Sequence, residues 1–367
     1  MERKYLNSAQ FFILVFVCGM AIKMFMLPAL LLKVSGRESI VVVTFYLIVE
    51  VVCLLFLLLT LSRNPDKTLY QILEETLGKI ISKIIIVYFS GLLLLKLLLM
   101  LSEVKVFFSV SIYERISWEI MIIPLLALCV GFATKPLTTI GRSAQIFMPL
   151  IVVSTIILSL LLSSNVPLFN ILPLFSNGAQ STIEGIKTFP VWFGDVSLLL
   201  VCLGNVKTGK KFVLKAVATR VFSAVFVLAF SLIMFSTYAD ITDLIDYGHN
   251  VSSMTQYSLG SHDYGRFDYI IYCFWMLAVI VKIILNFYVL SQNFRYVSQK
   301  SSQFIIPLIV FVVVYALTTF VLNNENSVYQ MATGIARIVF LPAEFLFPIF
   351  VFLLALVKYK RAEENKG

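Results

Sequence analysis

Long apolar runs separated by short polar segments repeat along the whole chain. Ten runs are long enough to cross a bilayer as helices, and they lack the strict alternation expected of strands in a membrane barrel. We place them at residues 9–32, 38–61, 82–110, 118–134, 143–163, 187–205, 213–239, 268–291, 304–322 and 331–357. The pattern predicts an all-α integral membrane protein in which residues 1–367 form a single transmembrane domain of ten helices.

The first and the sixth apolar runs both contain residues that interrupt a helix. Gly19, Lys23 and Pro28 lie within the first run, and the segment Phe189-Pro190-Val191-Trp192-Phe193-Gly194-Asp195 lies within the sixth. Interrupted helices at corresponding positions of two halves of a membrane protein indicate a small-molecule site near the bilayer midplane. We therefore expect a binding site where these two breaks meet.

The external polar segment 164–187 divides the ten runs into two groups of five. The first group spans residues 9–163 and the second spans residues 187–357, and each group begins with its interrupted run. An odd number of helices in each group makes the two groups insert with opposite orientations. The spacing thus predicts a five-plus-five inverted repeat with broken first and sixth helices.

Composition and charge agree with a membrane protein. Hydrophobic residues make up 60% of the chain and charged residues only 13%, too few to cover a water-soluble surface. Most lysines and arginines outside the runs, Arg220 counted among them, fall on the side that holds both termini, which the positive-inside rule assigns to the cytoplasm. The net charge of +9 therefore reflects topology rather than nucleic-acid binding. On the same side, residues 62–81 have the spacing of a short amphipathic helix at the inner surface.

Six ionisable residues lie well inside the apolar runs. They are Lys23, Glu50, Lys96, Asp195, Lys282 and Glu344. Each costs about 2.5–3.5 kcal/mol at the centre of a bilayer unless a partner or water compensates it. Three cations balance three carboxylates, so we expect a neutral interior network that lines a polar cavity. The alternative is that these groups only stabilise helix packing, or that Lys282 extends to the nearer, cytoplasmic end of its helix.

Residues at the two breaks are the candidate ligand-binding residues, because an interrupted helix frees backbone groups that suit an amino or carboxylate group. They are Gly19, Ala21, Lys23, Trp192, Gly194 and Asp195. The chain has only two histidines, both in the polar segment 238–268, and no catalytic or metal-binding constellation is evident. We therefore expect neither enzyme activity, nor a metal, nor a cofactor.

Three parts of the sequence are similar to a known family. They are Leu6-Asn7-Ser8-Ala9-Gln10-Phe11-Phe12, then Leu27-Pro28 followed by Gly36-Arg37-Glu38, and later Arg266-Phe267-Asp268-Tyr269 with Trp275 and Lys282. Together with the length and the ten runs, they resemble the endospore germination permeases, the B subunits of spore nutrient germinant receptors in the amino acid-polyamine-organocation (APC) superfamily. The resemblance implies the LeuT/APC-like inverted repeat, a ligand site between the first and sixth helices, and nutrient sensing in the spore inner membrane.

The resemblance also implies partners and exposes one departure. The implied partners are a small-molecule nutrient, most simply an amino acid, membrane lipid, an A-type membrane subunit and a C-type lipoprotein subunit. The superfamily usually has small residues at the first break, where this chain has Met20, Ile22 and Lys23 around Gly19. Lys23 therefore either neutralises a ligand carboxylate or pairs with Asp195, and Lys282 is placed to replace the sodium ion of sodium-coupled relatives.

Two other functions are compatible with the same sequence. A proton-coupled amino acid permease would use Glu50, Asp195 and Glu344 as proton carriers. An assembly scaffold would need none of the charged residues for a ligand. A germinant-sensing receptor subunit is the function that we expect first.

Overall fold

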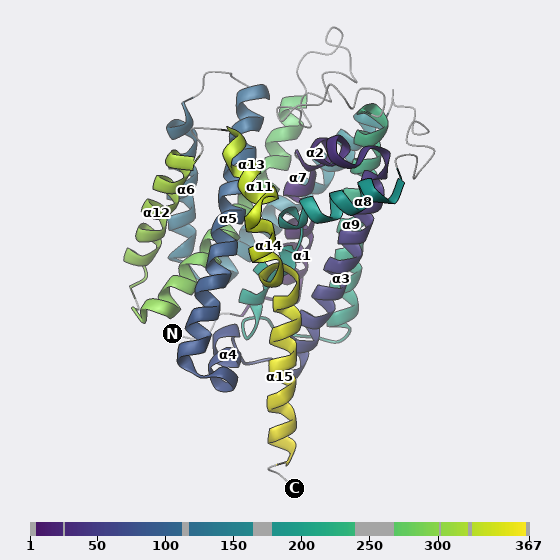
Figure 1. The fold of residues 1–367 in the computed structure, drawn as a ribbon. Helices are drawn as coiled ribbons and strands as arrows, with labels where there is room; N and C mark the ends of the chain where they lie inside the picture. Colours follow the sequence, from purple (N-terminus) through teal and green to yellow (C-terminus); the bar gives the residue numbers. More distant parts are fainter. Residues whose placement is uncertain are drawn as a thin grey trace.

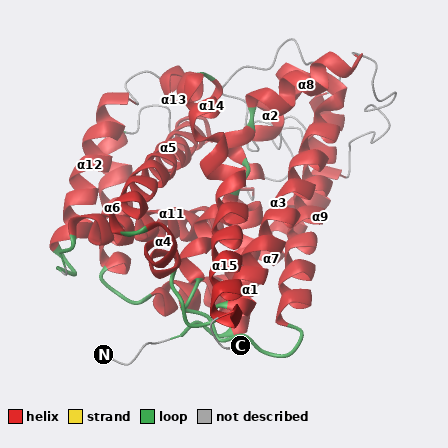
Figure 2. Ribbon diagram, turned by 60° about the horizontal axis from the view of Figure 1, so that its bottom comes forward, coloured by secondary structure: helices red, strands yellow, loops and turns green. Residues whose placement is uncertain are grey.

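A computed structural model describes residues 5–24, 26–111, 117–163, 178–238, 268–300, 302–321 and 325–364. Every regular element in these ranges is helical (Figure 2). Both histidines fall outside the described residues. In the first half the helices are α1 (Ser8–Met20), η1 (Ile22–Met24), α2 (Leu27–Ser35), η2 (Gly36–Glu38), α3 (Ser39–Arg63), α4 (Leu69–Leu77), α5 (Lys79–Ser111), α6 (Trp118–Ala133) and α7 (Leu137–Ser163).

The second half contains two segments that are not α-helical within otherwise apolar helices. Its elements are α8 (Gly178–Thr188), η4 (Pro190–Trp192), η5 (Asp195–Cys202), α9 (Phe212–Tyr238), α11 (Asp268–Ser298), α12 (Ile305–Val321), α13 (Glu325–Thr333), α14 (Ile335–Leu341), η7 (Pro342–Leu346) and α15 (Phe347–Glu364). The η5 segment is a 3₁₀ helix, and η7 is a π-helical turn between α14 and α15.

The chain is a multi-pass membrane protein. Within the described residues, six helices are long and apolar enough to cross a bilayer, and a seventh crossing arises if α8 and the segment Pro190–Cys202, bent by 57°, form one span. Three shorter apolar helices are Ser8–Met24, Glu119–Ala133 and Ile305–Phe320. The all-helical membrane class is therefore confirmed, whereas the count of ten helices and the inverted repeat stay predictions.

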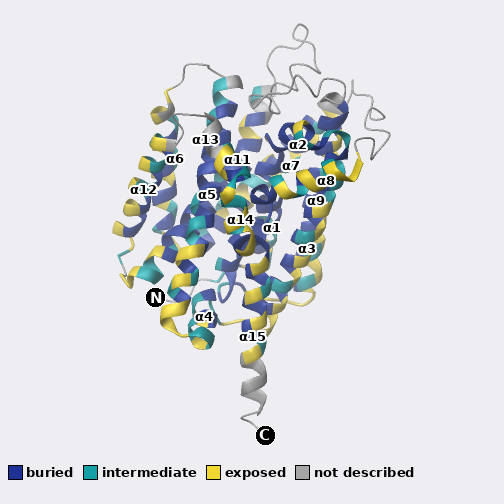
Figure 3. Cartoon of the chain, in the orientation of Figure 1, coloured by how far each residue is buried: buried dark blue, intermediate teal, exposed yellow. Residues whose placement is uncertain are grey.

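The helices form a bundle with α11 at its centre (Figure 1). The span Tyr272–Ser298 of α11 is 78% buried, whereas the span Leu137–Leu160 of α7 is only 28% buried. Helix α11 packs against α5, α6, α7 and α12, and α1 packs against α7 and α9. Exposed apolar side chains lie on the outward faces of the peripheral helices, as expected for surfaces that contact lipid (Figure 3).

The segments that precede α1 and follow η5 are joined at one end of the bundle. Asn7 caps α1, because its side chain accepts a hydrogen bond of 2.8 Å from the Gln10 amide and the Gln10 side chain bonds back to Asn7. One residue earlier, Leu6 forms a parallel bridge with Val206, with backbone hydrogen bonds of 2.8 Å and 3.0 Å. This bridge fixes the two interrupted segments relative to each other at one end.

The amphipathic helix predicted within residues 62–81 is confirmed as α4. Its apolar face is buried through Leu69, Ile72 and Leu73. Its Tyr70 hydroxyl donates to Asn293 Oδ1 of α11 at 2.8 Å, and burial raises the pKa of Tyr70, so the hydroxyl remains a donor. Helix α4 therefore docks against the bundle as well as presenting a polar face.

Candidate ligand site at two helix breaks

The first break follows Gly19 and Met20, where α1 ends and the chain turns through the 3₁₀ segment η1. A Cβ atom on Gly19 would lie 1.8 Å from Arg220 Nη1, so glycine is what allows this guanidinium to pack against α1. Lys23 points back along the break, and its Nζ donates to the Gly19 carbonyl at 3.1 Å. The Lys23 side chain is fully buried.

The second break begins at Pro190, which lacks a backbone donor and starts η4 after α8 ends at Thr188. Gly194 then adopts φ of +71°, a left-handed conformation that side chains other than glycine disfavour. A Cβ atom on Gly194 would also lie 2.1 Å from Glu344 Cγ. Proline and glycine together therefore unwind the chain here and place Asp195 at the start of η5.

The two breaks meet through an ion pair between Lys23 and Asp195. Lys23 Nζ lies 2.5 Å from Asp195 Oδ2 and 3.0 Å from Glu50 Oε1 of α3. Glu50 Oε1 also accepts the backbone amide of Asp195 at 3.2 Å. The cation of the first break is therefore held between the carboxylate of the second break and a carboxylate of α3.

Asp195 is the centre of a wider buried network. Its Oδ1 lies 2.9 Å from Lys282 Nζ of α11 and 3.5 Å from Lys96 Nζ of α5. Lys96 also pairs with Glu344 of η7 and donates to the Phe193 carbonyl. The exposed fractions of these side chains are between 0% and 4%, so water does not screen their interactions.

Two members of the network were not predicted from the sequence. Arg220 of α9 pairs with Glu50 and donates to Ser223 Oγ at 2.8 Å, and only 2% of its surface is exposed. Its assignment to the cytoplasmic charges was therefore wrong. Its position, about 12 Å of helix rise beyond Phe212, was the signal that it lies inside the span.

Glu103 of α5 is the second missed residue. It is 3% exposed, and its Oε1 accepts a hydrogen bond of 2.6 Å from Trp192 Nε1. Its place in the apolar run 82–110 was a usable signal. With Arg220 and Glu103 included, the site of the described chain holds four cations and four carboxylates, so the expected balance of charges persists with one more of each sign.

The structure brings together all six charged residues that the sequence singled out, and it places the other candidates beside them. Lys282 is buried against Asp195 rather than extended to a helix end. Trp192 and Gly194 flank Phe193, and Ala21 is buried at the end of α1. Of the two pairings considered for Lys23, the structure has the one with Asp195.

The chain itself occupies backbone groups at both breaks. The Gly19 carbonyl accepts Lys23, the Ala21 amide donates to the Val17 carbonyl at 3.0 Å, and the Gly194 carbonyl accepts the Ser197 amide at 3.1 Å. A ligand at this position would have to exchange these internal bonds for bonds of its own. Charged side chains that already exchange partners within a few ångströms are suited to that exchange.

Aromatic rings close the outer side of the second break. The ring of Phe193 stacks on Tyr46 of α3 with centroids 4.3 Å apart and an interplanar angle of 9°. Tyr46 in turn stacks on Phe345 at 5.8 Å. Lys23 Nζ lies 5.5 Å from the centre of the Phe193 ring, within range of a cation–π interaction. These rings separate the network from the periphery of the bundle.

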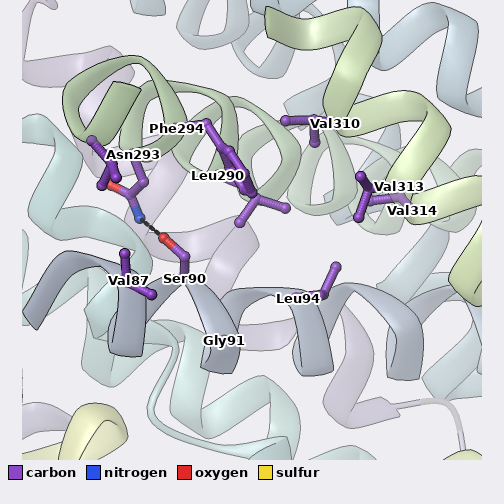
Figure 4. A pocket seen from close by; sticks show the side chains of 11 residues that line it. Val87, Ser90, Gly91, Leu94, Leu290, Asn293, Phe294, Val310, Val313 and Val314 are labelled. Atoms are coloured by element: carbon purple, nitrogen blue, oxygen red, sulfur yellow. Dashed lines mark hydrogen bonds between the residues drawn. The ribbon is translucent and has the colours of Figure 1, made fainter. Parts of the chain in front are cut away.

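An apolar hollow between α5, α11 and α12 is distinct from the charged site (Figure 4). It has a volume of about 190 Å³. Its polar lining is limited to Ser90 and Asn293, whose side chains bond to each other at 3.0 Å. Nothing in this lining favours a polar nutrient, so the two breaks remain the candidate ligand site.

Comparison with known proteins gives one match. A family model described as "Spore germination protein" matches residues 5–328, which include both breaks and all charged residues of the network except Glu344. No curated protein matches the chain.

Proposed function

Because the chain belongs to the spore germination protein family, we propose that it is the nutrient-sensing membrane subunit of a spore germinant receptor. Family membership and the membrane-spanning helices make it a membrane protein with a role in spore germination. The proposal adds that a small nutrient binds between the two breaks and that its binding triggers germination. It also places both termini in the cytoplasm and the chain in the spore inner membrane, as a ten-helix inverted repeat.

The observation that carries this proposal is the Lys23–Asp195 ion pair. It joins the two interrupted segments through side chains that are almost completely buried. Intramembrane charges are costly and mark functional sites by default. A nutrient that replaces this pair with its own charged groups changes how the two segments are held together, which is the difference between two states that sensing requires.

An amino acid is the ligand class that suits the site best. The buried cations and carboxylates are equal in number, and a zwitterion adds no net charge to that balance. Its carboxylate would pair with a lysine such as Lys23 or Lys282, and its amino group with Glu50 or Asp195. The partners that we propose are an A-type membrane subunit and a C-type lipoprotein subunit, by family resemblance.

Spores that carry Lys23→Met or Asp195→Asn test this function. Each variant should shift or abolish the nutrient dose-response while the protein still accumulates in the membrane. Lys67→Met is the matched control, because Lys67 pairs with Glu75 at 2.8 Å on the surface, where a third of each side chain is exposed. A normal dose-response in both site variants would assign the chain a scaffold role instead.

A proton-coupled amino acid permease is the second candidate. Its support is that Glu50, Asp195 and Glu344 are buried and connected through Lys23 and Lys96, as a proton relay would require. Purified protein in liposomes separates the two functions. Concentrative amino acid uptake driven by a pH gradient assigns the permease, and saturable amino acid binding without uptake assigns the receptor.

A further inference from the structure

A lateral groove lies between α3, α8, α14 and η7, on the outer side of the aromatic rings that cover the second break. Its volume is about 490 Å³. The residues that line it are Phe45, Tyr46, Val49, Ile186, Lys187, Pro190, Arg337, Ile338, Leu341, Phe345 and Leu346. The groove is thus an apolar channel with two cations and no acidic residue in its lining.

The two cations are held in neighbouring positions. Arg337 Nη1 donates to Thr188 Oγ1 at 3.2 Å, and Thr188 directly follows Lys187. The Tyr46 hydroxyl donates to the Ile186 carbonyl, which holds the end of α8 against α3. Two adjacent cations without a lining carboxylate favour an anion that accepts several charge-assisted hydrogen bonds, such as a phosphate group.

The rest of the groove is apolar and open to the surroundings of the bundle. The exposed fractions are 43% for Phe45, 68% for Ile338, 44% for Leu341 and 56% for Leu346. In a membrane protein, exposed apolar side chains at the level of a spanning helix contact acyl chains. Phosphate-binding cations beside an acyl-binding channel are the two halves of a phospholipid site.

We propose that this groove binds one anionic phospholipid, with its phosphate on Lys187 and Arg337 and an acyl chain along Phe45, Leu341 and Leu346. The floor of the groove is Tyr46, which stacks on Phe193 of the second break. A bound acyl chain therefore presses on the outer face of the rings that cover the charged network. The lipid site does not depend on which nutrient, if any, binds at the breaks.

The test is native mass spectrometry of the purified full-length chain, stripped of lipid and titrated with phosphatidylglycerol or phosphatidylcholine. The native chain should bind one phosphatidylglycerol in preference to phosphatidylcholine. Lys187→Gln with Arg337→Gln should weaken that binding about 20-fold, since each cation near a lipid surface contributes roughly 1 kcal/mol. Leu341→Trp should block binding by filling the apolar channel without changing the charge.

The matched control removes two cations elsewhere. Lys210→Gln with Lys211→Gln lowers the charge equally in an exposed loop and should keep the preference for phosphatidylglycerol. The proposal is overturned if the native chain binds both lipids equally, if the control loses the preference as fully as the groove variant, or if Leu341→Trp binds normally. Loss of a dimer in the groove variants, with no lipid preference in the native chain, would instead assign the groove to a second copy.

Discussion

The first break, between α1 and α2, is short, whereas the second, between α8 and η5, changes the direction of the chain by 57°. The first resumes α-helical geometry at Leu27 after one 3₁₀ turn. The second continues as 3₁₀ helix through Asp195–Cys202 and has no α-helix until Phe212. Backbone hydrogen bonds therefore support the first break well and the second break poorly.

The difference in backbone support is matched by a difference in side-chain contacts. Lys23 of the first break has two carboxylate partners, Glu50 and Asp195. Asp195 of the second break has three lysine partners, which come from the first break, α5 and α11. The charged network thus stabilises the less regular segment more, and that segment is the one expected to rearrange when the network changes. Four predictions test this comparison.

Neutralising the centre of the network should have the largest effect. Asp195→Asn leaves Lys282 without an ion-pair partner among the described residues and should cost about 3–5 kcal/mol of stability. Lys23→Met should cost less, because Asp195 keeps Lys96 and Lys282. Thermal unfolding of the purified protein in detergent measures both. The double variant should lose less than the sum of the two, and strictly additive losses would contradict a shared network.

Adding a methyl group at each break should distinguish the two backbones. Gly194→Ala meets Glu344 and also requires φ of +71°, so we expect a loss of about 2–4 kcal/mol. Gly19→Ala should cost less, because it sits in helical backbone and displaces only the end of the Arg220 side chain. Gly131→Ala, with open space around it, is the control in the same unfolding assay. A larger loss for Gly19→Ala would reverse the comparison.

Removing a hydrogen bond that only the second break has should cost about 1–3 kcal/mol. Trp192→Phe keeps the aromatic volume but leaves the buried Glu103 carboxylate without its 2.6 Å donor. Denaturant unfolding followed by circular dichroism measures the loss. Glu103→Gln keeps an acceptor for the indole and should be better tolerated. If Trp192→Phe is as stable as the native chain, this bond contributes nothing to the second break.

The smallest effect is expected where α1 begins, far from the first break itself. Asn7→Ala removes the side-chain cap of α1 and should cost about 1 kcal/mol. Asn7→Asp retains an acceptor for the Gln10 amide and should restore most of that stability. The same thermal assay compares the two. A loss equal to that of Asp195→Asn would mean that stability at the first break depends on its helix end rather than on the network.

Local sequence rules anticipated much of this arrangement. Pro190 and Gly194 restrict or free the backbone wherever they occur, so the second break was readable without any tertiary contact. Charged residues within long apolar runs were equally visible, because a bilayer leaves them no solvent. The boundaries of the spans were less secure, and Arg220 was placed on the wrong side of one for that reason.

What the sequence alone determined is the membrane class, the two interrupted segments and most of the buried charges, because helix-breaking residues and intramembrane charges act through the chain's own chemistry. The tertiary structure decided which charges pair. Lys23 and Asp195 are far apart along the chain, and Lys96, Lys282, Glu50 and Arg220 approach them from different helices. Pairing across helices depends on packing angles and rotations that the spacing of residues within one helix does not encode.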